Sequence, residues 1–204
     1  TGSVTNLKNL VNNSGVVAAD VTGVGTARER LAAASYGTGL AIFAHGTTGS
    51  ATAISNLVNT SGVIASDVSG VGTARFGLAA SSFGGDKAIF GYGRPGSGNS
   101  SLTNLVSNVG VLSSDVTGVG TARRDIAAAS YGGDKGVFGY GISGSSSNVT
   151  NKVSNVGVVA TDTTGVGSAR YYLAATGYGG DKAIFGFGST GSVTGITNLV
   201  NNSG

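Results

Sequence analysis

The sequence predicts an all-β repeat protein, and three observations support this prediction. The tripeptide Thr-Ala-Arg or Ser-Ala-Arg recurs four times, at intervals of 47, 48 and 47 residues. Glycine occupies 38 of the 204 positions, and the apolar segments between clusters of Gly, Ser, Thr and Asn are only five to eight residues long. A helix needs about ten or more residues of periodic apolar pattern, so these short segments indicate β-strands.

Each repeat contains four candidate strands. In the second repeat they cover residues 75–82, 87–93, 102–108 and 110–114. The first two are joined by Gly-Gly-Asp-Lys at residues 84–87, a composition typical of tight hairpin turns because glycine accepts positive φ angles. Apolar and small residues alternate along the second strand, so its two faces differ. Each repeat is therefore expected to form one four-stranded antiparallel sheet.

A period of 40 to 50 residues is typical of units that bury their faces by stacking on their neighbours. With strands as the elements, residues 1–204 are predicted to form a β-propeller of four-stranded blades, about 47 residues per repeat, with four repeats present. Residues 1–15 and 190–204 are near-duplicates and are interpreted as partial blades. The ring is expected to include further blades from flanking sequence or a second chain; a closed four-bladed ring is the alternative.

One stretch carries a family resemblance. Residues 73–93, TARFGLAASSFGGDKAIFGYG, resemble the kelch repeat, with an Arg before a small-residue strand, a turn, and an aliphatic-aromatic strand ending in glycines. The match recurs four times and covers nearly the whole chain. The family's Tyr-Asp of the third strand and Trp of the fourth are absent, and residues such as Leu112 lie near the Trp position. The chain is also similar to Gly/Ala-rich kelch-like arrays of bacteriophage and marine viral structural proteins, which implies a virion or extracellular location.

Composition argues against several function classes. The net charge is +3 and charged residues make up 10% of the chain, with basic residues spread along it, so no nucleic-acid partner is expected. No apolar run is long enough for membrane insertion. There is no cysteine, and His45 and Glu29 are the only residues of their types, so no metal, cofactor or catalytic residue is predicted. His45 occupies an aromatic column and is interpreted as a packing residue.

An aspartate precedes each repeated arginine by eight residues. We interpret these pairs as structural, with a charge-assisted hydrogen bond closing the loop before each arginine. The alternative is a ring of arginines beside the channel that binds an anion. The pairs are Asp20 with Arg28, Asp67 with Arg75, Asp115 with Arg123, and Asp162 with Arg170.

Positions that differ between repeats are the candidates for recognition, because packing holds the other columns constant. They lie directly after the repeated arginine or in the loop between the second and third strands, and these two loops are expected to emerge on one face. The candidate binding residues are Arg30, Phe76, Arg94, Arg124, Tyr171 and Tyr172.

The function predicted from these observations is a non-enzymatic structural or interaction module displayed on a larger assembly. Its expected partners are another protein or further blades of the same protein. The alternative is a multivalent glycan-binding propeller that uses Tyr, Asn and backbone groups in equivalent pockets between blades, with avidity from repetition.

Overall fold

The computed structural model describes residues 3–204 and contains four three-stranded antiparallel sheets in this range. The first two sheets comprise β1 (Ala32–Tyr36), β2 (Leu40–Ala44), β3 (Ser55–Val58), β4 (Ala79–Phe83), β5 (Lys87–Gly91) and β6 (Thr103–Val106). The other two comprise β7 (Ala127–Tyr131), β8 (Lys135–Gly139), β9 (Thr150–Val153), β10 (Ala174–Tyr178), β11 (Lys182–Gly186) and β12 (Thr197–Val200). This part of the chain has no helix long and apolar enough to cross a membrane.

The prediction of four strands per sheet is wrong by one strand. The expected fourth strand at residues 110–114 meets β6 only through isolated bridges, from Val106 to Leu112 and from Thr103 to Val116. The ladder is interrupted because side chains take the place of backbone groups. The Nδ2 of Asn104 donates to the carbonyl of Ser113 at 3.1 Å, and the N–H of Leu105 donates to the Ser113 hydroxyl at 2.9 Å.

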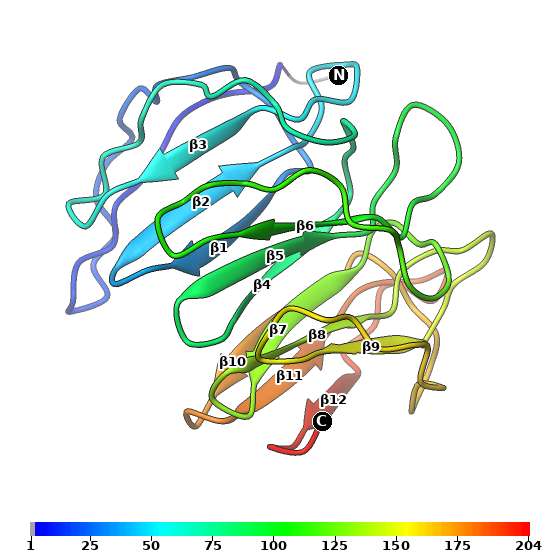
Figure 1. Ribbon diagram of the computed structural model, residues 1–204. Coiled ribbons are helices and arrows are strands. Elements are labelled where there is room, and N and C mark those ends of the chain that lie inside the picture. Colours follow the sequence, from blue (N-terminus) through cyan, green and yellow to red (C-terminus); the bar gives the residue numbers. More distant parts are fainter. Residues whose placement is uncertain (1–2) are drawn as a thin grey trace.

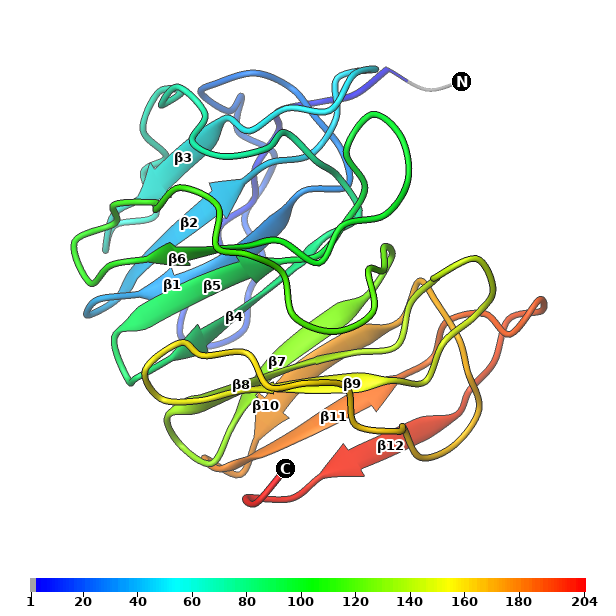
Figure 2. The same cartoon turned by 45° about the vertical axis from the view of Figure 1, so that its right-hand side comes forward.

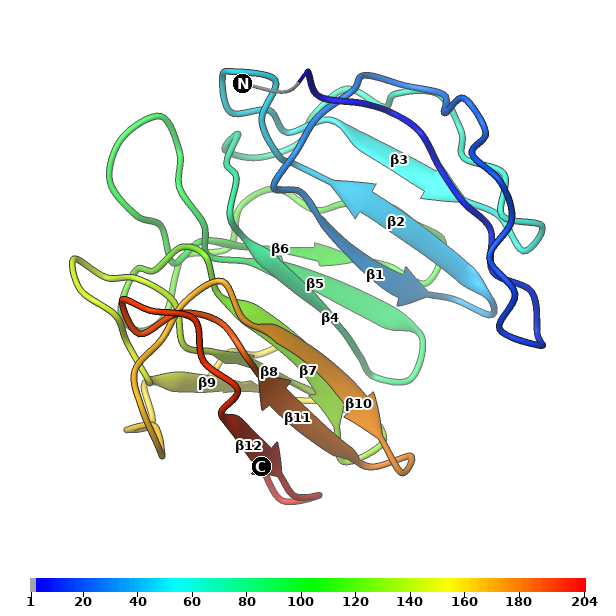
Figure 3. The same cartoon turned by 180° about the vertical axis from the view of Figure 1, so that it is seen from behind.

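The sheets stack in chain order, with β1 against β4, β4 against β7 and β7 against β10 (Figure 1). Figure 2 shows β3 and β12 at opposite ends of this stack, and Figure 3 shows the same order from behind. Residues 3–204 therefore form an open stack, with the N-terminal segment alongside its first sheet. The closed four-bladed ring considered above is not formed by these residues.

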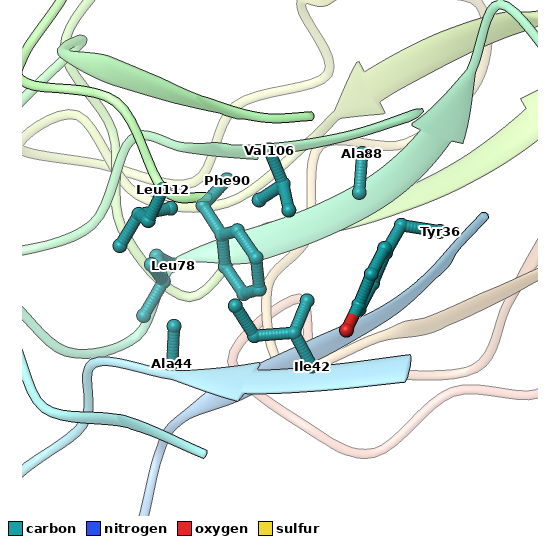
Figure 4. Packing of buried hydrophobic residues seen from close by; sticks show 8 residues of the cluster. All are labelled: Tyr36, Ile42, Ala44, Leu78, Ala88, Phe90, Val106 and Leu112. Atoms are coloured by element: carbon teal, nitrogen blue, oxygen red, sulfur yellow. The ribbon is translucent and has the colours of Figure 1, made fainter. Parts of the chain in front are cut away.

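An apolar layer fills each space between neighbouring sheets. Between the first and second sheets, Phe90 points toward Ile42 beside Leu78 and Ala44 (Figure 4). At the next two junctions, glycine in the middle strand allows a close approach of the neighbouring ring. A Cβ on Gly91 would lie 2.8 Å from the Phe138 ring of the next sheet, so a side chain here would force the ring to shift.

Backbone hydrogen bonds also join the second sheet to the third. The N–H of Gly84 donates to the carbonyl of Asp134 at 2.7 Å, and the N–H of Gly93 donates to Arg123 at 2.8 Å. In the opposite direction, the N–H of Asp125 donates to Gly77 at 2.7 Å. Equivalent bonds occur at the other two junctions. The stack is thus held by a repeated junction of apolar packing and backbone bonding.

Candidate functional site

The repeated arginines are structural centres of their sheets. The Arg123 side chain is fully buried, and its Nε donates to the carbonyl of Tyr140 at 3.0 Å. One terminal nitrogen donates to Oδ1 of Asn151 at 2.6 Å, and the other donates to the carbonyl of Thr121 at 3.3 Å and lies 3.6 Å from Asp162. The guanidinium of Arg123 therefore directs its N–H donors to groups of the protein itself.

The predicted pairing of each aspartate with the arginine eight residues later is wrong. Asp115 lies 3.4 Å from Arg75, forty residues before it, and Asp162 likewise faces Arg123. Asp115 lies beside the earlier arginine because its carboxylate accepts hydrogen bonds from Asn104 of its own sheet and from the N–H and hydroxyl of Thr73. Burial alone would raise the pKa of Asp115, but these hydrogen bonds and Arg75 lower it overall.

The same geometry argues against the arginine ring as an anion site. Arg75, Arg123 and Arg170 are each fully buried, so no shared open channel of guanidinium groups exists among the described residues. Asp67 repeats the arrangement by accepting bonds from Thr26 and Asn56. Asp20 differs: its side chain accepts a bond from Asn9 at 2.8 Å, and no described arginine stands beside it.

An aromatic column lies over these arginines from the preceding sheet. The guanidinium carbon of Arg123 is 4.8 Å from the ring centre of Tyr92, and that of Arg170 is 4.2 Å from Tyr140. His45 fills this column in the first sheet and is buried, which confirms its packing position. Both of its ring nitrogens lack a hydrogen-bond partner. Burial and then the charge of Arg75 lower the pKa of His45 to about 3.

The variable positions gather at one end of the stack, which we name the mouth face: Arg30, Phe76, Gly77, Arg94, Arg124, Asp125, Tyr171 and Tyr172. Isolated bridges join Phe76 to Arg94 and Tyr171 to Ser189, so the loop before the first strand lies beside the loop after the second. The expectation that these two loops share a face is confirmed. All six candidate binding residues belong to it.

An ion pair spans the mouth face across the second sheet. Arg30 donates to Oδ1 of Asp125, and Arg124 donates to the other carboxylate oxygen at 2.6 Å. The pair passes over Gly77, where a Cβ would lie 2.6 Å from Asp125. Arg30 also lies over the Phe76 ring, 4.7 Å from its centre. Asp125 and Gly77 were not among the predicted binding residues, although they share one variable column with Arg30 and Tyr172.

A shallow pocket of about 290 Å³ opens beside this ion pair. Its floor is apolar, formed by the residue that follows the variable column in each repeat: Leu31, Leu78, Ile126 and Leu173. Tyr172 is 61% exposed at the rim, and its ring meets Tyr171 edge-on with centres 4.9 Å apart. The site can offer an apolar floor, two aromatic rings and a cluster of two arginines and one aspartate to a ligand. Within residues 3–204, no three His, Asp or Glu side chains are grouped to hold a metal ion.

The repeated sheets and their shared junction define a β-propeller-like repeat protein. Comparison of the sequence with protein-family models and with curated proteins finds no match.

Proposed function

We propose that this chain is a non-enzymatic interaction module, a kelch-like scaffold displayed on a larger assembly such as a virion, a fibre or an extracellular protein. It binds a protein partner through the mouth face. One observation carries this proposal: the repeated arginines direct their donors to groups of the protein itself, whereas the variable residues Arg30, Gly77, Asp125 and Tyr172 line one pocket.

The composition of the mouth face favours a protein partner. Tyr and Arg dominate the energetics of protein interfaces because they combine a large contact area with directed hydrogen bonds. Here Tyr172 stands at the rim with Tyr171 edge-on against it, while Arg30 and Arg124 are held in place by Asp125. Held side chains lose little conformational entropy on binding, which favours affinity.

The glycan alternative has less support. It needs tyrosines in pockets between blades, and the tyrosines at these positions, Tyr92 and Tyr140, are both buried beneath an arginine of the next sheet. Each also donates its hydroxyl to a backbone carbonyl, at 3.2 Å in both cases. Neither ring is free to stack on a sugar. A sugar could still stack on Tyr171 and Tyr172, so glycans serve as a second probe in the test.

The test is selection of a displayed random-peptide library on the full chain. We expect recovered peptides to bind wild type and to bind Tyr172→Ala at least about tenfold more weakly, as for an aromatic anchor of an interface. Val109→Ala is the matched control, because Val109 is an apolar side chain 71% exposed in the turn after β6, at the end of the stack opposite the mouth face. Peptides that bind both variants equally well would contradict the proposal. Binding only on a glycan array, lost in Tyr172→Ala, would favour the lectin alternative.

A further inference from the structure

The free flank of the fourth sheet presents side chains that the other sheets bury. Phe187 is 63% exposed, whereas His45, Tyr92 and Tyr140 in the same column are at most 2% exposed. Tyr178 is 41% exposed, although its counterparts in the other sheets are almost fully covered. This flank therefore has the side chains of a junction without a neighbouring sheet.

Backbone groups on the same flank repeat this pattern. Gly46, Gly93 and Gly141 each donate an N–H to the repeated arginine of the following sheet. Gly188 holds the equivalent position after β11 and makes no such bond within residues 3–204. An arginine carbonyl of a further repeat would complete the junction.

The opposite flank has a matching slot. A pocket of about 370 Å³ lies between the first sheet and the N-terminal segment, which runs along the outside of that sheet (Figure 3). Arg28 and Phe43 line it. In the interior junctions, the equivalents of Arg28 are covered by an aromatic ring, and the equivalents of Phe43 contact the same ring, as Phe138 contacts Tyr92 with centres 5.1 Å apart.

We propose that the β10–β11 hairpin of one molecule inserts into this slot of a second copy. Phe187 then covers Arg28 and packs on Phe43 of the second copy, and the N–H of Gly188 donates to the carbonyl of Arg28. Each contact reproduces an interaction already present at the interior junctions. The association is head-to-tail, because the two surfaces that meet are different. It does not depend on the mouth face or on the proposed function.

A second copy fits because the repeat continues in register. Residues 1–15 and 190–204 are the same at 12 of 15 positions, and overlaying them places Arg28 of the second copy 47 residues after Arg170. On insertion, β12 of the first molecule and residues 8–11 of the second copy compete for the same place at the outer edge of the sheet. Residues 8–11 bridge to Val17 and Val21 as β9 bridges to residues 159 and 163, so they occupy the place that β12 takes on insertion. We assign that place to β12, which is already paired with β11, and residues 8–11 of the second copy move aside.

Sedimentation velocity of the full chain over a wide concentration range tests the proposal. We expect wild type to associate as its concentration rises. Phe187→Arg should weaken association by about tenfold or more, because it opposes the charge of Arg28. Phe187→Ser tests the loss of the ring alone, and Val109→Arg controls for an added surface charge, because Val109 is 71% exposed on the second repeat, away from both flanks. A wild type that stays monomeric throughout, or association that Phe187→Arg leaves unchanged, would overturn the proposal.

Thiol crosslinking tests the direction of association, since the chain has no cysteine. Phe187→Cys and Phe43→Cys molecules are mixed and treated with a short bifunctional maleimide. We expect a covalent dimer that contains one molecule of each variant. Crosslinking of Phe187→Cys to itself as efficiently as to Phe43→Cys would contradict the head-to-tail arrangement.

Discussion

The guanidinium of Arg123 lies over the ring of Tyr92, a residue of the preceding sheet, at 4.8 Å. The same arginine holds Asn151 of its own sheet at 2.6 Å. Burial raises the pKa of Tyr92 to about 12, so its hydroxyl stays protonated and donates to the carbonyl of Val119 at 3.2 Å. One arginine thus orders its own sheet and fastens it to its neighbour.

Asp115 and Asp20 provide a matched pair of substitutions. Asp115→Ala removes the acceptor of Thr73 and Asn104 and leaves the buried charge of Arg75 without its counter-ion. We expect the free energy of unfolding to fall by about 2–4 kcal/mol. Asp20→Ala removes only an exposed bond to Asn9 and should change stability by less than about 0.5 kcal/mol. Urea unfolding of both variants measures the difference, and equal losses would refute the assigned pairing.

His45 is the weak member of the aromatic column. In His45→Tyr, the new hydroxyl can donate to the carbonyl of Val71, as Tyr92 donates to Val119, and the ring can cover Arg75. Two buried nitrogens without partners disappear in the same change. We expect a gain of about 1–3 kcal/mol in the free energy of unfolding. His45→Phe separates the ring from the hydroxyl. Thermal or urea unfolding that shows a loss of stability in His45→Tyr would contradict this prediction.

The pH dependence of stability should carry a signature of His45. Its pKa is about 3 in the folded chain, against 6.5 for an unperturbed histidine. Between these values the unfolded chain binds a proton that the folded chain does not, so stability falls as the pH drops below 6.5. From pH 7 to pH 5, wild type should lose about 2 kcal/mol more than His45→Phe. Unfolding curves at both pH values test this; parallel losses in the two proteins would rule it out.

Gly77 leaves the space through which Arg30 reaches Asp125. Gly77→Ala would place a methyl group 2.6 Å from the Asp125 carboxylate, in a backbone with φ of 62°. Gly98→Ala is the control, because Gly98 has a similar φ of 69° and open space around it. Both variants bear about 1 kcal/mol of backbone strain, and Gly77→Ala should lose about 1–3 kcal/mol more. Equal destabilisation in urea would show that the ion pair does not need this gap.

Local patterns predicted the hairpins well. The strands expected at residues 87–93 and 102–108 contain β5 and β6, because turn glycines and alternating residues act over short distances. The prediction of a fourth strand was wrong because the side chains of Asn104 and Ser113 replace its backbone ladder. Strand propensity does not report this effect.

Long-range pairing was harder to predict. Asp115 lies eight residues before one arginine and forty after another, and sequence spacing favoured the nearer one. Stacking of sheets brings the distant arginine within 3.4 Å. The candidate site was found in part, because variable columns pointed to the mouth face. The Arg30–Asp125 ion pair was not predicted from the sequence. It depends on the absence of a side chain at Gly77, in the repeat between these two residues.

The stack of Arg123 on Tyr92 is the central relationship of this fold, and a double-mutant cycle tests it most directly. Unfolding free energies are measured for wild type, Tyr92→Leu, Arg123→Met and the double variant. We predict a coupling energy of about 1–2 kcal/mol between these residues, as for a desolvated cation–π pair. The control cycle pairs Tyr92 with Arg170, which stacks on Tyr140 instead, and should give less than about 0.5 kcal/mol. A coupling energy near zero for Tyr92 and Arg123 would contradict the claim that the repeated arginines fasten successive sheets together.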